Sequence, residues 1–213
     1  MPQSGRFDLL VQELDRLREH LLPSKFSPLG IYTDQQLTQV IAYRVLTHAE
    51  IEAYLEDRVW EVVLDSIKVW KSEGKSSRTL LSLMGFCGFL LDAPPSTLNP
   101  SKGNKTVPDE KLKIDKKIDR TATSFKKVID GNHGLKESNI LALLLPIGID
   151  NDSIDSAWLS TMNTFGTQRG VAAHTSASSY KASQPPDPKI ELDTVNEVLI
   201  GLKTIDRLVN DLM

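Results

Sequence analysis

One short segment of the chain brings together two side chains suited to acting on a phosphodiester. Arg169 and His174 stand five positions apart, and Gly-Val-Ala-Ala lies between them. Histidine titrates near neutral pH and can accept or give a proton. Arginine stays charged and binds phosphate oxygens with two parallel donors. Cleavage of RNA without a metal needs such groups, because one group must take the 2′-hydroxyl proton, one must protonate the leaving 5′-oxygen, and cations must stabilise the phosphorane.

The spacing of the pair limits how it can act. On an ideal helix, residues five apart differ by about 140° around the axis and by about 7.5 Å along it, so they do not share a face. One histidine cannot readily be both base and acid in one step, and a two-fold dimer would bring two copies of each group together. A cleft at a helix edge and a groove between protomers both fit this spacing. Taken alone, the two residues are also consistent with a surface arginine and a hydrogen-bonded histidine that have no role in catalysis.

The elements that must position the pair are helices. Apolar residues recur at helical spacing almost throughout, and alternating β-branched runs are nearly absent, which predicts an all-α helical bundle. We expect residues 1–213 to form a single domain with two long surface loops, over 92–108 and 176–189, where proline, serine and glycine interrupt the period. Asp34 is expected to cap the longest helix, which has a possible kink over 47–50. The expected helices cover 9–21, 34–71, 76–91, 109–129, 136–145, a segment through 158–165, and 190–212.

Composition excludes several other classes of protein. The formal charge is −3, so attraction of the whole protein to nucleic acid is not expected, and any polyanion site must be a local patch. Cys87 is the single cysteine, so an intrachain disulfide is impossible and zinc-ligand spacing is absent. The sequence has no P-loop or HExxH motif, no signal-peptide layout and no apolar run of about 20 residues. We therefore expect no metal, no cofactor and no membrane contact, and a cytoplasmic location.

A wider pattern surrounds the arginine and the histidine. The segments HAEIEAYLEDRVWEVV, HGLKESNILALLLPIGID and FGTQRGVAAHTS follow one another along the chain. Together they resemble the HEPN superfamily, and in particular its RiboL-PSP-HEPN-like domains, over about residues 35–210. The resemblance implies an all-helical, metal-independent endoribonuclease that acts as a homodimer. It implies that Arg169 binds the scissile phosphate and that His174 is the general acid and base, leaving a 2′,3′-cyclic phosphate and a 5′-hydroxyl.

The resemblance also suggests a setting and an alternative. Many proteins of this kind are bacterial toxins or phage-defence effectors, so RNA and an antitoxin or another partner protein are the expected partners. Gly170 stands where many family nucleases have a polar residue, often asparagine; Gln168, Thr175 or Ser176 could supply a polar group instead. Gly170 and the net negative charge favour the alternative, a non-catalytic HEPN module that binds RNA, a nucleotide or a partner protein.

Three polar residues of the longest expected helix are candidates for a supporting role. His48, Glu52 and Glu56 follow one another at four-residue spacing, so they are neighbours on the helix surface. The family likeness suggests that an acid from this helix orients Arg169 or His174. Glu52 is the preferred candidate, because it lies along the apolar stripe of this helix and should point inward and need a partner. An ordinary polar ladder on the helix surface is the alternative.

A basic stretch offers a second way to contact RNA. Residues 102–127 contain nine lysines and arginines against four acids, which gives a local charge of +5. Such a patch could follow a phosphate backbone, or it could be a solvated helix face. The expected nucleic-acid-binding residues are Lys113, Lys116, Lys117 and Arg120.

Overall fold

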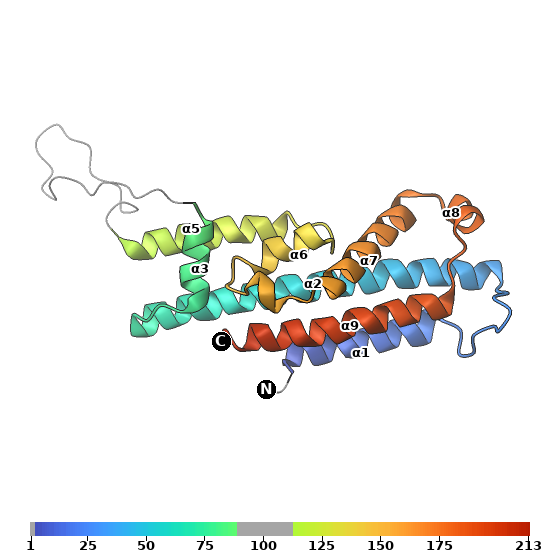
Figure 1. The fold of residues 1–213 in the computed structure, drawn as a ribbon, viewed down its shortest axis with the longest axis horizontal. Helices are drawn as coiled ribbons and strands as arrows, with labels where there is room; N and C mark the ends of the chain where they lie inside the picture. Colours follow the sequence, from blue (N-terminus) through green and yellow to red (C-terminus); the bar gives the residue numbers. More distant parts are fainter. Residues whose placement is uncertain (1–2, 89–112) are drawn as a thin grey trace, which may run out of the picture.

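The computed structural model describes residues 3–88 and 113–213, and these residues form helices and connections without a strand (Figure 1). The predicted all-α bundle is therefore confirmed. The helices are α1 (Gly5–Leu21), α2 (Asp34–Glu73), α3 (Arg78–Phe86), α5 (Ile114–Asp130), α6 (Glu137–Leu144), the 3₁₀ turn η1 (Asn151–Ser153), α7 (Ser156–His174), α8 (Ala177–Ser183) and α9 (Pro188–Asn210).

Two expectations about loops have different outcomes. The loop expected over 92–108 lies outside the described residues. The prediction of a loop over 176–189 is wrong for its first half, because Ala177–Ser183 forms α8. Two residues, Thr175 and Ser176, connect α7 to α8. Tyr180, the only large apolar side chain in this short helix, is buried, and it provides the packing that the sequence pattern did not reveal.

Helix α2 is the longest element, and the other helices pack along it. It runs for 40 residues, and the helix is not interrupted over 47–50. Its N-cap is Thr33 rather than the expected Asp34. The Thr33 hydroxyl accepts from the Gln36 backbone N–H, and the Gln36 side chain accepts from the Thr33 N–H, which makes a reciprocal capping box. The helix ends at Glu73 and is capped by Gly74, whose φ of 67° lies in the left-handed region that glycine adopts readily.

The apolar core lies where α2 meets α1, α9 and α7. Figure 1 shows α1 and α9 lying along α2, with α7 rising across them toward the end of the bundle where α8 sits. Leu10, Val59, Phe165 and Val198, one from each of these four helices, are fully buried. Packing against α2 therefore fixes the inner half of α7, while its last residues extend toward the surface.

A buried carboxylate joins the N-terminus to two of the core helices. Asp206 of α9 is fully buried and accepts hydrogen bonds from the Ser4 backbone N–H at 2.8 Å and the Ser4 hydroxyl at 2.6 Å. It also accepts from the Tyr54 hydroxyl at 2.8 Å and from Arg58 Nε at 3.2 Å, both on α2. A buried charge is tolerated only when it is paired and hydrogen-bonded, and here several donors meet that need.

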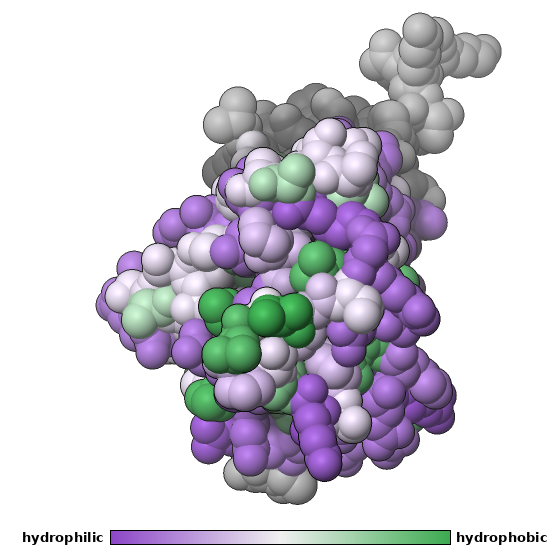
Figure 2. Space-filling view, turned by 90° about the vertical axis from the view of Figure 1, so that its right-hand side faces the viewer, coloured by the Kyte–Doolittle hydropathy of each residue, from purple (hydrophilic) through white to green (hydrophobic). Residues whose placement is uncertain are grey.

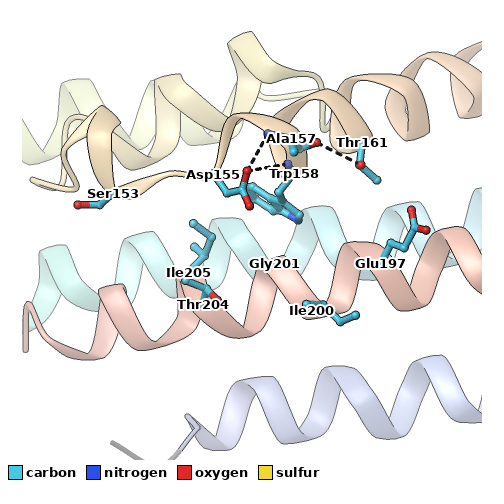
Figure 3. A pocket seen from close by; sticks show the side chains of 10 residues that line it. All are labelled: Ser153, Asp155, Ala157, Trp158, Thr161, Glu197, Ile200, Gly201, Thr204 and Ile205. Carbon is cyan, nitrogen blue, oxygen red and sulfur yellow. Dashed lines mark hydrogen bonds between the residues drawn. The ribbon is translucent and has the colours of Figure 1, made fainter.

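The start of α7 is fixed against α9 by a tryptophan that lies on a glycine. Asp155 caps α7 by accepting from the backbone N–H groups of Ala157 and Trp158. The Trp158 ring lies between the two helices above Gly201 (Figure 3). Its Nε1 donates to the Val198 carbonyl at 3.2 Å. A cavity of about 350 Å³ opens beside this contact, and Asp155, Trp158, Glu197 and Ile200 are among the residues that line it.

Replacing Gly201 with alanine is expected to lower the free energy of unfolding by about 2 kcal/mol, because overpacking a core contact costs roughly 1–3 kcal/mol. A Cβ atom at this position would overlap with the Cδ1, Nε1 and Cγ atoms of Trp158. Urea denaturation followed by circular dichroism measures the change. Gly170→Ala is the matched control, since a Cβ there meets nothing within 4 Å. It should stabilise the helix by about 0.5–1 kcal/mol, and equal effects at the two glycines would contradict the packing described.

Candidate active site

Arg169 and His174 both lie on α7, and regular helix connects them. Arg169 is partly buried one turn after Phe165, whereas His174 is the last residue of the helix and is exposed. Since the helix is continuous, the separation of about 140° and about 7.5 Å applies. Within one protomer the two side chains leave α7 in different directions, so the structure does not bring them onto one face.

The guanidinium of Arg169 has an unused donor. Its Nε atom is buried and has no hydrogen-bond partner among the residues that the structure describes. No carboxylate of residues 3–88 or 113–213 forms an ion pair with this side chain. Leaving a buried donor unpaired costs about 1–3 kcal/mol. A charged, partly buried donor of this kind is suited to an anion such as phosphate.

A line of polar residues runs along α2, and one of them faces α7. Arg44, His48, Glu52 and Glu56 follow at four-residue spacing, which places them along one side of α2. The His48 ring is buried and stacks on Phe165, with the ring centroids 5.5 Å apart and an angle of 29° between the planes. Side chains on a helix lean toward its N-terminus, so Arg169 leans back toward the turn of α7 that carries Phe165.

Two members of the line also have unpaired polar atoms. Both ring nitrogens of His48 and the Oε1 atom of Glu52 are buried without a partner in the described part of the chain. His48 Nδ1 and Glu52 Oε2 are 3.5 Å apart, a distance at which a charged pair forms only when the imidazole is protonated. The Glu52 side chain is only 15% exposed, which confirms that it points inward. Beside α7 there are therefore polar groups that have no hydrogen-bond partner among residues 3–88 and 113–213.

Glu56 belongs to a different contact. Its Oε1 atom accepts a hydrogen bond from Asn132 Nδ2 at 2.8 Å, in the connection between α5 and α6. Burial raises the pKa of the Glu56 carboxyl, the hydrogen bond from Asn132 opposes this, and the charge of Glu52 adds to it. The candidate support residues therefore divide into two groups: His48 and Glu52 lie beneath α7, and Glu56 holds the connection between α5 and α6.

The basic residues of α5 lie apart from the end of α7. Lys113 precedes α5, and Lys116, Lys117 and Arg120 lie in its first half, at the opposite end of the bundle from α8 in Figure 1. Acids of the same helix contact α2, since Trp70 donates to Asp115 at 2.8 Å and Lys71 pairs with Asp119 at 3.2 Å. The structure therefore does not bring this patch together with Arg169 and His174.

Sequence reasoning missed three residues near the end of α7. Arg44 is buried and bound to Tyr180 of α8 and to Glu191 of α9. Arg44 stands four residues before His48, so the spacing that singled out His48, Glu52 and Glu56 extends to it. No comparable signal marked Tyr180 or Glu191, because their burial depends on contacts between distant parts of the chain.

The described residues give no support for a metal site or for a membrane-spanning helix. Residues 3–88 and 113–213 contain no group of three or more histidine, cysteine or acidic side chains placed to hold a metal ion. None of the helices in this part of the chain is long and apolar enough to cross a membrane.

Comparison with known proteins identifies the family. The family model described as RiboL-PSP-HEPN matches residues 10–211, which is nearly the whole chain. Searches of curated proteins and of solved structures give no match. The all-α bundle agrees with this family, whose domains are helical. The chain therefore belongs to the RiboL-PSP-HEPN family, as the segments around Arg169 and His174 predicted.

Proposed function

We propose that this protein is a metal-independent endoribonuclease of HEPN type, with residues 1–213 as one domain. The observation that carries the proposal is the arrangement on α7, in a chain of this family. Arg169 offers a partly buried guanidinium whose Nε has no protein partner, and His174 offers an exposed imidazole at the end of the same helix. These are a group that binds an anion and a group that moves a proton at neutral pH.

The proposed reaction balances without a metal or cofactor. A neutral His174 takes the proton from the 2′-hydroxyl, and the 2′-oxygen attacks the adjacent phosphorus. The bond from phosphorus to the 5′-oxygen breaks, and a protonated His174 gives that oxygen its proton. Arg169 binds the non-bridging oxygens and stabilises the charge that builds up on them. The products are a 2′,3′-cyclic phosphate and a 5′-hydroxyl.

The two roles of histidine call for two copies of the site. One imidazole cannot be base and acid in the same step, and Arg169 and His174 of one helix face different directions. A two-fold homodimer that joins the ends of two α7 helices supplies both histidines and both arginines. The end of the bundle that carries α8 exposes the apolar residues Leu29, Ile31 and Ile190, and Figure 2 shows apolar surface gathered there among hydrophilic residues. Such surface is typical of protein contact sites.

Residues outside α7 have supporting roles in this proposal. Glu52 is proposed to orient Arg169 or His174 by its charge rather than by a direct ion pair, with His48 packed on Phe165. Lys113, Lys116, Lys117 and Arg120 bind RNA away from the scissile phosphate, and so contribute mainly to long substrates. We further propose that the activity serves a toxin or phage-defence system, with an antitoxin or another protein as its regulator.

Gly170 and the placement of α5 favour one alternative. Gly170 offers no polar group next to Arg169, and the basic patch lies at the other end of the bundle. A non-catalytic HEPN module that binds RNA, a nucleotide or a partner protein fits both observations.

An assay on mixed RNAs in the presence of EDTA separates these functions. The proposal expects cleavage that survives EDTA and leaves 2′,3′-cyclic phosphate and 5′-hydroxyl ends, which phosphatase and kinase treatment identify. Binding to RNA without cleavage would support the non-catalytic module instead. A protein that neither cleaves nor binds RNA would contradict the nuclease proposal.

A further inference from the structure

The segment that follows His174 is held by buried charged groups. We propose that Tyr180 is a positioning residue for His174, held in place by the buried pair of Arg44 and Glu191. The inference rests on the proposed catalytic role of His174. It assigns a function to α8 and to a set of contacts that the reaction itself does not use.

Three helices meet at Tyr180. Its side chain is buried, its hydroxyl accepts a hydrogen bond from Arg44 Nη1, and the Arg44 guanidinium carbon lies 5.7 Å from the centre of its ring. Arg44 also binds Glu191 through two donors, with Nε 2.8 Å from Oε2 and Nη2 bonded to Oε1. Tyr180 lies on α8, Arg44 on α2 and Glu191 on α9, so the cluster connects α8 to two core helices.

The cluster is better explained by positioning than by stability alone. Taking two charges out of water offsets much of their attraction, so a buried ion pair is weak evidence for stability. Burial lowers the pKa of Arg44, but the hydrogen bond and charge of Glu191 more than offset this, and the guanidinium stays charged. What the pair provides is direction, because its two parallel hydrogen bonds fix the plane of the guanidinium that Tyr180 contacts.

Helix α8 depends on this anchor. It has seven residues, and helices so short are not stable in water without tertiary contacts. Apart from Tyr180 its side chains are mainly exposed serine and alanine. A second contact comes from the next residue, since Lys181 pairs with Asp34 and donates to Thr38 Oγ1 at 3.1 Å. Both contacts join α8 to α2.

The anchor acts on His174 through a very short connection. Thr175 closes α7 by donating its N–H to the Val171 carbonyl at 3.1 Å, and Ser176 already caps α8. His174 is exposed, and no hydrogen bond of its imidazole holds it against the described part of the protein. Terminal turns of helices open readily. With α8 anchored directly after it, the last turn of α7 stays closed and keeps the imidazole in place.

The test compares two tyrosine-to-phenylalanine variants of the whole protein. Tyr180→Phe should lower kcat about tenfold with KM unchanged, since losing a hydrogen bond of about 1.4 kcal/mol corresponds to that factor. Tyr54→Phe is the matched control, because it also removes one buried hydrogen bond of a tyrosine hydroxyl, here to Asp206 at 2.8 Å, and Tyr54 lies outside the proposed site and contact surface. A kcat for Tyr180→Phe equal to that of Tyr54→Phe would overturn the inference, as would a raised KM with unchanged kcat.

A second measurement needs no cleavage. The ring signals of His174 in proton–carbon NMR spectra, assigned with His174→Gln, should broaden or shift in Tyr180→Phe and stay unchanged in Tyr54→Phe. Unchanged His174 signals in Tyr180→Phe would overturn the inference even if the protein cleaves RNA. Changed signals in a protein that does not cleave RNA would uphold the positioning of His174 and refute the proposed function alone.

Discussion

Arg169→Ala is expected to lower the rate of RNA cleavage about 10³-fold, because arginines that stabilise the transition state of phosphoryl transfer contribute factors of this size. The change removes the only charged group on α7 that can bind the scissile phosphate. Arg169→Lys keeps the charge but loses the planar fork, so it should retain intermediate activity. Single-turnover cleavage of a defined RNA measures both variants.

The same variants test whether Arg169 contributes to the stability of the fold. Its Nε has no partner in the described structure, so its removal should leave the free energy of unfolding within about 1 kcal/mol of the original. Arg16→Ala serves as the control, since Arg16 is exposed and pairs only with Glu13 of its own helix. Full cleavage by a pure, folded Arg169→Ala sample would refute the assigned role.

Asp206→Ala is expected to lower the free energy of unfolding by about 3–5 kcal/mol, which is the usual effect of removing one partner of a buried charge pair. The substitution removes the buried counter-charge of Arg58, which keeps only its contacts with Glu61 and Asn210 among the described residues, and it takes the acceptor away from Ser4 and Tyr54. These contacts hold the N-terminus, α2 and α9 together, so their loss affects the bundle as a whole. Urea unfolding followed by circular dichroism measures the change.

A surface aspartate of the same helix is the control for that experiment. Asp193 pairs with Lys189 one turn away, and both side chains are about half exposed. Exposed pairs contribute little, so Asp193→Ala should change stability by no more than about 0.5 kcal/mol. A loss of less than about 1 kcal/mol for Asp206→Ala would contradict a structural role for its buried contacts.

The sequence predicted those parts of the fold that depend on local patterns. Apolar residues at helical spacing predicted helices over 9–21, 34–71 and 136–145, and α1, α2 and α6 occupy these ranges within a few residues. The N-cap of α2 was misplaced by one residue, because Thr33 and Asp34 are both suitable caps and only the reciprocal bond with Gln36 decides between them.

Features that depend on distant contacts could not be predicted. Helix α8 has one large apolar residue, and it forms because Tyr180 reaches Arg44, 136 positions away along the chain. Arg58 and Asp206 are charged, and charged residues of an amphipathic helix usually lie on its solvent-exposed face. Their burial follows from the packing of α9 on α2, which no periodicity encodes.

For the candidate site too, features that depend on local patterns could be predicted and features that depend on distant contacts could not. The sequence alone indicated Arg169 and His174, and it also indicated that Glu52 points inward, since Glu52 follows the apolar stripe of its helix. It did not indicate that the basic residues around Lys116 lie at the far end of the bundle from His174, because that separation arises from the way α5 and α7 pack on α2.

The most direct test of the account is a mixed dimer of one original chain and one His174→Ala chain. The two chains, given different tags, can be co-expressed and the mixed dimers purified. If one groove uses both imidazoles, one as base and one as acid, the mixed dimer lacks one of them and should cleave RNA as slowly as the His174→Ala homodimer. Mixed dimers that cleave at about half the original rate would contradict a site shared between protomers, because each protomer would then act with its own site.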